Sequence, residues 1–351
     1  MNSKSIRIGV VGLGYWGPNL ARNFAAIPGC ELAWLCDPSE KARERYAPLY
    51  PQASIGSSLD ELLDDPALDA IVLATPVPDH AGHAVDVLGS GRHCFVEKPM
   101  AQSVADAERV LEAARSSGTV LMVGHLLEYH PGVVKLKELS DGGELGEVYY
   151  IYGNRLNLGK LRADENALWS LGAHDVSVLL HLADEEPCEA IARGESFVQP
   201  GVEDVVFCFL RFASGLSAHL HLSWLDPHKE RRFTVVGSRR MATFDDMALE
   251  GKVTVYDKGF DQDANGYGEY IARSGEIFSP WLPSQEPLRI ECEHFIQCIR
   301  DGSTPRSDGE SGLRVVRVLE QLQDSLRASA RGVRAQAGPA AAAAAPGRAV
   351  G

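Results

Sequence analysis

The chain has 351 residues, which is too long for one ordinary hydrophobic core, so we expect two domains. Hydrophobic residues make up 45% and charged residues 23%, as in folded, soluble proteins. The net charge of −14 argues against a nucleic-acid partner, and no apolar run approaches the roughly 20 residues of a membrane helix. The N-terminus does not resemble a signal peptide, and the seven cysteines form no CxxC pair. These features favour a cytoplasmic protein without a disulfide framework or a metal site.

Residues 1–126 alternate between short apolar segments typical of buried strands and segments typical of helices. Short apolar strands separated by helices indicate parallel strands in a sheet that helices cover on both faces. We therefore expect an α/β domain with a doubly wound parallel sheet. Its predicted strands are residues 6–12, 31–37, 70–76, 93–99 and 120–125.

The pattern changes after residue 126, where strands follow one another with short turns. Residues 127–332 are predicted to form an α+β domain with an open, largely antiparallel sheet. The polar, Gly-rich segment 261–276 is expected to be a loop, and the Ala/Gly/Pro-rich tail 333–351 to be disordered. The predicted helices are 131–139, 166–182, 288–300 and 310–330, and the predicted strands are 147–155, 189–197, 204–212, 216–224, 231–236, 241–245 and 252–257.

A GxGxxG motif follows the first predicted strand and opens the first predicted helix. Gly12 permits a tight turn, Gly14 lets the backbone approach a pyrophosphate, and Gly17 lets helix and strand pack closely. The helix N-terminus offers free N–H groups and a positive dipole end to the phosphates. In this context the motif predicts a Rossmann domain that binds a dinucleotide, with Tyr15 and Trp16 also in contact with it.

Asp37 ends the second predicted strand, at the distance from the motif expected of the acidic residue that binds the ribose hydroxyls. A carboxylate there repels a 2′-phosphate, and the following Pro38 and Ser39 supply no Arg for one. NAD is therefore predicted over NADP. The alternative is that Asp37 only caps the next helix.

Three residues after the next strand are predicted to contact the cofactor. Thr75 and Pro76 close that strand at the sheet edge that should face the nicotinamide half. His80 follows and can contact cofactor or substrate, or can be a solvated residue at the start of a helix.

Glu97, Lys98 and Pro99 end the strand 93–99, at the carboxyl edge where ligands bind. Burial beside a cationic nicotinamide lowers the pKa of a lysine and makes Lys98 usable in proton transfer, with Glu97 orienting it at the cofactor. His174 lies early in the helix predicted at 166–182 and can also take a hydroxyl proton. The alternatives are a surface lysine at 98 and a core or capping histidine at 174.

Together, GLGYWG, Ala-Thr-Pro at 74–76, Glu-Lys-Pro at 97–99, Gly-His at 124–125 and the later Gly-x-His-Asp resemble the Gfo/Idh/MocA family of oxidoreductases. The resemblance covers the chain except its tail. It implies hydride transfer between NAD(P) and a carbinol of a sugar, cyclitol or sugar nucleotide, with Lys98 as the catalytic lysine and His125 at the substrate. The family's Asp-x-x-x-His motif falls on Ser170 and His174, so the usual carboxylate is missing. The resemblance also implies a homodimer or homotetramer formed through the C-terminal sheet.

The stretch 153–162 gathers three cations and two amides in an otherwise acidic chain. Arg155 and Arg162 suit a phosphate, and Asn157 suits sugar hydroxyls, although a solvated strand end is the alternative. We therefore expect a dehydrogenase that oxidises a secondary alcohol, at C3, of a nucleotide sugar or sugar phosphate. The rivals are a cyclitol or free-sugar dehydrogenase, an enzyme that uses NAD transiently to cleave a glycoside, and a non-catalytic NAD-binding sensor, which the loss of Asp at Ser170 keeps open.

Overall fold

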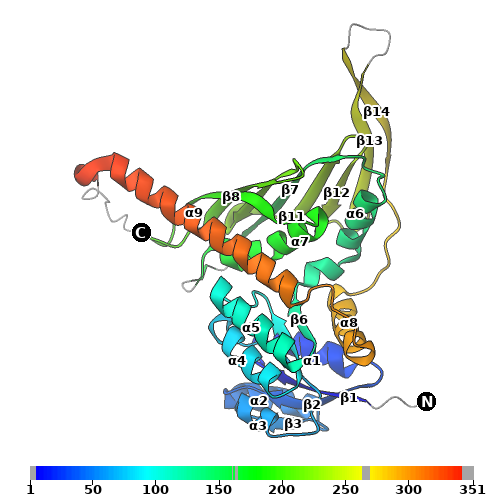
Figure 1. Cartoon of the computed structure of the whole chain (residues 1–351), viewed down its shortest axis with the longest axis vertical. Coiled ribbons are helices and arrows are strands. Elements are labelled where there is room, and N and C mark those ends of the chain that lie inside the picture. Colours follow the sequence, from blue (N-terminus) through cyan, green and yellow to red (C-terminus); the bar gives the residue numbers. More distant parts are fainter. Residues whose placement is uncertain (1–4, 160, 163–164, 263–268, 342–351) are drawn as a thin grey trace.

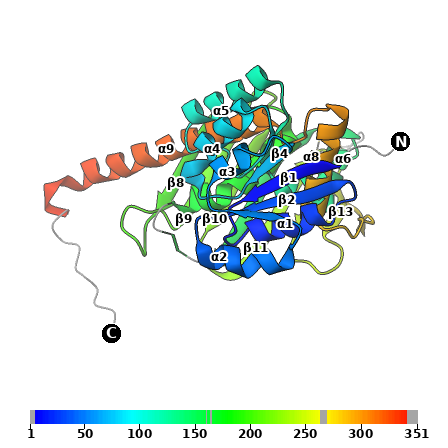
Figure 2. The same ribbon diagram turned by 90° about the horizontal axis from the view of Figure 1, so that it is seen from below.

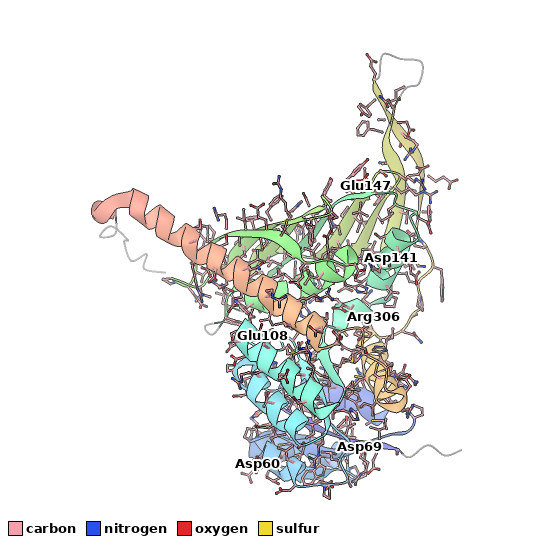
Figure 3. The ribbon with its side chains drawn as sticks, in the orientation of Figure 1. Asp60, Asp69, Glu108, Asp141, Glu147 and Arg306 are labelled. Carbon is pink, nitrogen blue, oxygen red and sulfur yellow. The ribbon has the colours of Figure 1, made fainter. Side chains whose placement is uncertain are left out.

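The computed structural model describes residues 5–159, 161–162, 165–262 and 269–341. Two sheets lie at opposite ends of the molecule, with helices between and around them, as Figure 1 shows. Asp60 marks the N-terminal domain and Glu147 the start of the C-terminal sheet in Figure 3, and Arg306 lies between them at the junction of the domains. The expected two-sheet α/β architecture is confirmed.

The N-terminal sheet has six parallel strands in the order β3-β2-β1-β4-β5-β6. This order reverses direction between β1 and β4, which is where a doubly wound sheet binds its ligand. The strand β3 was not predicted because its three residues are too short to show a pattern. The strands are β1 (Ile6–Val11), β2 (Cys30–Cys36), β3 (Ser54–Gly56), β4 (Ala70–Leu73), β5 (His93–Glu97) and β6 (Leu121–Gly124).

Helices cover both faces of this sheet, as the view from below in Figure 2 shows. One face packs against α3, α4 and α5, and the other against α1 and α8. The helix α8 comes from the far end of the chain, and its Phe295 contacts Phe24 and Phe95 with ring centroids 6.2 and 5.7 Å apart. The helices are α1 (Gly17–Ala25), α2 (Glu40–Tyr46), η1 (Ala47–Leu49), α3 (Leu59–Leu63), α4 (Val77–Gly89), α5 (Val104–Ser117) and α8 (Pro287–Asp301).

The C-terminal sheet has eight strands in the order β14-β13-β12-β11-β7-β10-β9-β8. Only the pair β7 and β10 is parallel among these neighbours, so the predicted open, largely antiparallel sheet is confirmed. The strands are β7 (Val148–Leu158), β8 (Pro187–Glu195), β9 (Val205–Phe212), β10 (Ser217–Ser223), β11 (Leu225–Gly237), β12 (Met241–Asp245), β13 (Val253–Gln262) and β14 (Tyr270–Phe278).

Helices pack on one face of this sheet and build the larger core of the molecule. The other face carries exposed aromatic side chains, because β9 alternates strictly between buried and exposed residues, with Phe207 and Phe209 outward. No helix of the described residues is long and apolar enough to cross a membrane. The covering elements are η2 (Leu126–Tyr129), α6 (Pro131–Asp141), η3 (Leu168–Gly172), α7 (Ala173–Ala183) and α9 (Gly309–Ala341).

Two expectations for the C-terminal half differ from the structure. The segment 261–276, expected to be a loop, contains the end of β13 and most of β14, and these strands pair with each other, with Lys258 opposite Ser274 and Gln262 opposite Tyr270. This ribbon projects from the body in Figure 1, so its outer half has solvent on both faces and lacks the apolar alternation of a packed strand. Residues 263–268 lie outside the described residues. The helix α9 continues to Ala341, well into the expected tail, because Ala has the highest helix propensity.

Candidate active site

The glycine-rich turn between β1 and α1 is tight on one side and open on the other. Gly12 has φ +95°, and a Cβ there would lie 2.4 Å from the carbonyl oxygen of Ala74. A Cβ on Gly17 would lie 1.7 Å from the carbonyl oxygen of Gly12, so helix and turn pack backbone to backbone. A Cβ on Gly14 would meet nothing within 4 Å. The predicted role of each glycine is therefore consistent with its surroundings, and the open space at Gly14 suits a pyrophosphate.

The start of α1 leaves its first turn available to an anion. Its N-cap residue, Trp16, makes no side-chain capping bond, so no side chain competes there for the first N–H groups. Tyr15 is almost fully exposed, while the Trp16 indole faces the carboxyl of Glu97. Trp16 of the motif thus brings the glycine-rich turn next to the end of β5.

Asp37 binds the backbone on both sides of the expected ribose site. Its Oδ2 accepts a hydrogen bond of 2.7 Å from the N–H of Leu13, and its Oδ1 accepts one of 2.8 Å from the N–H of Ser39. The N-cap of α2 is Ser39, so the capping alternative for Asp37 is not what the structure shows. A carboxylate has about four acceptor positions, and two hydrogen bonds leave capacity for ribose hydroxyls.

Arg43 is a neighbour of this site that sequence reasoning missed. Its guanidinium donates hydrogen bonds of 2.7 and 2.9 Å to the carbonyl oxygens of Asp37 and Pro38. Arg43 is six residues from Asp37 in the sequence, but the first turns of α2 bring it back to the end of β2. An arginine therefore lies beside the position where a 2′-phosphate would bind.

The loops after β4 and β5 are joined by His80. Thr75 and Pro76 lead into α4 at the carboxyl edge of the sheet, as predicted. The ring of His80 is buried, with Nδ1 2.8 Å from the carbonyl oxygen of Pro99 and Nε2 2.9 Å from that of Thr75. Because both nitrogens face backbone carbonyls, His80 supports these two loops and offers no free nitrogen to a ligand.

Lys98 extends from the end of β5 into the C-terminal domain. Its Nζ donates a hydrogen bond of 3.4 Å to the backbone carbonyl of Ser170 in η3. Burial lowers the pKa of Lys98, and the carboxylates of Glu97 and Glu165 oppose this shift. Burial also raises the pKa of Glu97 to about 7. A lysine with a lowered pKa at the nicotinamide edge can accept a proton at a pH where a solvated lysine cannot.

Two histidines approach Lys98 from the other elements of the site. His125 follows β6 and is buried, neither of its ring nitrogens has a hydrogen-bond partner among the residues that the structure describes, and burial together with Lys98 lowers its pKa to about 3. His174 lies in the first turn of α7, and its buried Nδ1 has no hydrogen-bond partner in the described part of the chain. Burial, and after it Lys98, holds the pKa of His174 well below the usual value. Both imidazoles are neutral near pH 7, so each presents one donor and one acceptor nitrogen.

The two arginines of the basic stretch before η3, Arg155 and Arg162, both form ion pairs within the protein. Arg155 is buried and forms an ion pair with Asp175, the residue after His174. Arg162 pairs with Glu165 at 3.0 Å, and the buried Oδ1 of Asn157 has no hydrogen-bond partner within the described ranges. Lys160 lies outside the described residues. The two arginines predicted to grip a phosphate therefore each have a carboxylate partner.

Two further residues of the site were not predicted. Arg231 of β11 lies opposite Arg155 of β7 in the antiparallel pair and adds to the positive potential at His174. Glu165 lies on a cleft of about 810 Å³ that Thr75, Pro99 and Trp169 also line. The positions of Arg231 and Glu165 depend on strand pairing and loop path, which no local pattern reveals.

This arrangement defines an NAD-binding oxidoreductase of two domains, with a dinucleotide cradle in one and a lysine–histidine site between both. The family model of the "Oxidoreductase family, NAD-binding Rossmann fold" matches residues 6–125, and that of the "GFO/IDH/MocA C-terminal domain" matches residues 133–243. The chain belongs to the Gfo/Idh/MocA family of oxidoreductases, and its cofactor is NAD.

Named relatives span nearly the whole chain. The UDP-N-acetylglucosamine 3-dehydrogenase of Acidithiobacillus ferrooxidans is 27% identical over 325 residues, covering 92% of this chain and 98% of that protein. A solved structure of it superimposes with a TM-score of 0.77, covering 92% of this chain and 98% of the other at 26% identity. The scyllo-inositol 2-dehydrogenase (NAD(+)) of Bacillus subtilis (strain 168) is 23% identical over 312 residues, covering 86% and 88%.

Proposed function

We propose that the protein oxidises a secondary alcohol of a nucleotide sugar, at C3, with NAD as hydride acceptor. The proposal rests on one contact, the hydrogen bond from Lys98 of the N-terminal domain to the backbone carbonyl of Ser170 in η3. One turn further along the chain, α7 begins and carries His174. A substrate between the domains would thus have a base on one side and a neutral imidazole on the other. The choice of a nucleotide sugar rests on the name of the Acidithiobacillus relative, which matches this chain over 92% of its length.

In the proposed step, the deprotonated amine of Lys98 accepts the proton of the substrate hydroxyl. His174, held neutral by burial, hydrogen-bonds the same oxygen and orients it. The two ring nitrogens of His125, which bond to none of the described residues, lie in the same buried region and can bind a neighbouring hydroxyl. NAD, when bound at the glycine turn, supplies the acceptor for the hydride that leaves the carbon.

A cyclitol or free sugar is the second candidate substrate, and one observation favours it. The arginines expected to bind a phosphate are paired, Arg155 with Asp175 and Arg162 with Glu165. A substrate without phosphate would need neither guanidinium. The Bacillus subtilis relative is named for such a substrate, although it shares only 23% identity with this chain.

One assay distinguishes these candidates. NADH formation would be followed with UDP-N-acetylglucosamine, dTDP-sugars, inositols and free sugars under the same conditions. Turnover with nucleotide sugars alone supports the first proposal, and turnover with inositols or free sugars alone replaces it by the second. Cleavage of a glycoside without net NADH would indicate transient use of NAD. Binding of NAD without turnover of any of these compounds would favour a sensor.

We also propose that the active form is a homodimer or homotetramer joined through the C-terminal sheet, in the cytoplasm. The support lies in the outer face of that sheet, where Tyr152 stacks between Tyr150 and His219, and Phe207 stacks on His221. Such an aromatic surface is typical of a contact between subunits. Sedimentation of the full-length protein tests the assembly, and a monomer at micromolar concentration would contradict it.

A further inference from the structure

We infer that a second cleft, beside Arg231 and Lys252, binds the nucleoside diphosphate part of a nucleotide sugar, with the base stacked on Trp281. This cleft would be a subsite of the proposed active site, so the sugar attached to the diphosphate rests on the proposed function. The cleft itself is a feature of the fold, and its ligand can be tested without any turnover.

The second cleft has a volume of about 770 Å³, within the roughly 300–1,000 Å³ of small-molecule sites. It is lined by η2, by Arg231 of β11, by the turn between β12 and β13, and by the segment 279–286. That segment joins β14 to α8 and runs down the side of the molecule in Figure 1. The cleft thus has walls from both sides of the domain boundary.

The cleft adjoins both histidines of the active site. Leu126, which lines it, directly follows His125. Arg231, which also lines it, lies opposite Arg155 in the pairing of β11 with β7. The ion-pair partner of Arg155 is the residue directly after His174. A sugar ring held at these histidines would therefore leave its substituent beside Arg231.

Positive charge remains inside the cleft, because two cations share one carboxylate. Arg231 and Lys252 each lie 3.4 Å from a carboxylate oxygen of Asp246. Lys252 also donates to the backbone carbonyl of Asp246, at 2.5 Å, which leaves one of its three N–H groups for a ligand. By contrast, Arg155 and Arg162 each have a carboxylate of their own. A phosphate can accept hydrogen bonds from both cations of the cleft.

The other acidic side chains of the lining do not cancel this charge. Glu286 pairs with Arg22 of α1, at 2.6 Å. Glu250 is exposed in the turn between β12 and β13, where solvent and salt screen its charge. His130 places its Nε2 3.4 Å from Asp246 and so brings a third basic group to the same carboxylate. The interior of the cleft therefore suits an anionic group.

Trp281 supplies a flat apolar surface on the same cleft. Its side chain is 82% exposed, although a tryptophan is usually largely buried. Pro280 and Pro283 flank it and restrict the backbone on both sides, so the ring is presented in a limited set of directions. Nucleotide bases stack on such rings with little dependence on the base. Diphosphate and base therefore each have a place in the lining.

Calorimetry with the full-length protein, saturated with NADH to occupy the glycine-rich turn, tests this subsite. UDP and inorganic pyrophosphate are the probes, and UDP is expected to bind. Trp281→Ala should weaken the binding of UDP about 5–150-fold, the effect of losing a stacked aromatic ring, and leave that of pyrophosphate unchanged. Lys252→Ala should weaken the binding of both probes, because it removes a charged donor to the phosphates.

Lys258→Ala is the matched control, because it removes the same charge from β13, beyond the described residues that line the cleft. It should bind both probes as the unmutated protein does. Trp281→Phe keeps an aromatic ring and should retain most of the affinity for UDP. Failure of UDP to bind, or equal affinities in Trp281→Ala, Lys252→Ala and the unmutated protein, would overturn the inference. UDP binding that both substitutions weaken, without oxidation of any nucleotide sugar, would overturn the proposed function alone.

Discussion

Arg155 and Asp175 form a buried ion pair that joins β7 to the first turn of α7, one residue after His174. Because the sheet and the helix are separate elements, this pair holds the first turn of α7, which carries His174, against β7. Burial raises the pKa of Asp175 and Arg155 opposes that shift, so the carboxylate depends on its partner for its charge. The pair is therefore a support of the site, which differs from the phosphate-binding role expected of Arg155.

Arg155→Ala should destabilise the protein by about 3–5 kcal/mol, because it leaves a buried carboxylate without its cation. Urea unfolding, followed by circular dichroism, measures this loss. Arg109→Ala is the comparison, since its pair with Asp106 is exposed and an exposed pair contributes only about 0–1 kcal/mol. A variant at 155 with native stability and a raised KM for a phosphorylated substrate would restore the phosphate-binding interpretation.

Lys98→Met should reduce kcat by about 10²–10⁴-fold while NAD still binds, since the substitution removes the proposed general base and keeps the apolar stem. His174→Ala should cost less, because its neutral imidazole orients the hydroxyl and does not carry the proton. Steady-state kinetics with the substrate identified in the NADH assay, together with calorimetry of NAD binding, measure both effects. Near-full turnover in Lys98→Met and none in His174→Ala would reverse the two roles.

NAD(H) should bind at least about tenfold more tightly than NADP(H), because the carboxylate of Asp37 repels a 2′-phosphate. Asp37→Ala should reduce the difference between the affinities for NAD(H) and NADP(H). A second variant at Arg43 extends the experiment. Its guanidinium lies 2.7 Å from the Asp37 carbonyl oxygen, so it can turn toward a phosphate once the carboxylate is gone. Asp37→Ala with Arg43→Ala should therefore bind NADP(H) more weakly than Asp37→Ala alone. Calorimetry with both cofactors decides, and equal affinities in the unmutated protein would contradict the prediction.

The contribution of Glu128 to the stability of the fold should decline as the pH rises from about 4.5 to about 8. Its side chain is 2% exposed, and burial raises its pKa from 4.5 to about 8. A carboxyl with a higher pKa in the folded chain favours folding in its protonated form, so its contribution is complete below pH 4.5 and is lost as the pH passes about 8.

Glu128→Gln should flatten that decline, since a neutral amide keeps the shape of the protonated acid. Unfolding free energies measured in urea at several pH values test this, with Glu108→Gln on the exposed side of α5 as the control. A decline equally steep in Glu128→Gln and in the unmutated protein would show that other groups cause it.

The parts of the site that could be predicted lie in short, continuous patterns. The glycine turn, Asp37 and Lys98 each follow the end of an apolar strand. Because the alternation of strands and helices predicts parallel strands, these three ends are expected at the same edge of the sheet. His174 was found from its position early in an amphipathic helix. For these residues, local sequence and the rules of parallel sheets suffice.

The remaining parts depend on contacts between distant segments. His80 faces Thr75 and Pro99 together, and Arg155 meets Asp175 only once β7 lies under α7. The hairpin of β13 and β14 was missed for a related reason, since a ribbon exposed on both faces carries no apolar alternation. Burial and pairing decide these features, and neither can be read from a single segment.

The placement of α8 has a consequence for how the chain folds during its synthesis. Phe24 and Phe95 are fully buried and complete their contacts with Phe295, which is translated much later. At the usual rate of about 5–20 residues per second, roughly 10–30 seconds separate the end of β6 from the appearance of α8. During that interval one face of the nascent nucleotide-binding sheet is covered by α1 but lacks α8. The apolar surface around Phe24 and Phe95 is therefore expected to stay partly exposed on the nascent chain until α8 leaves the ribosome.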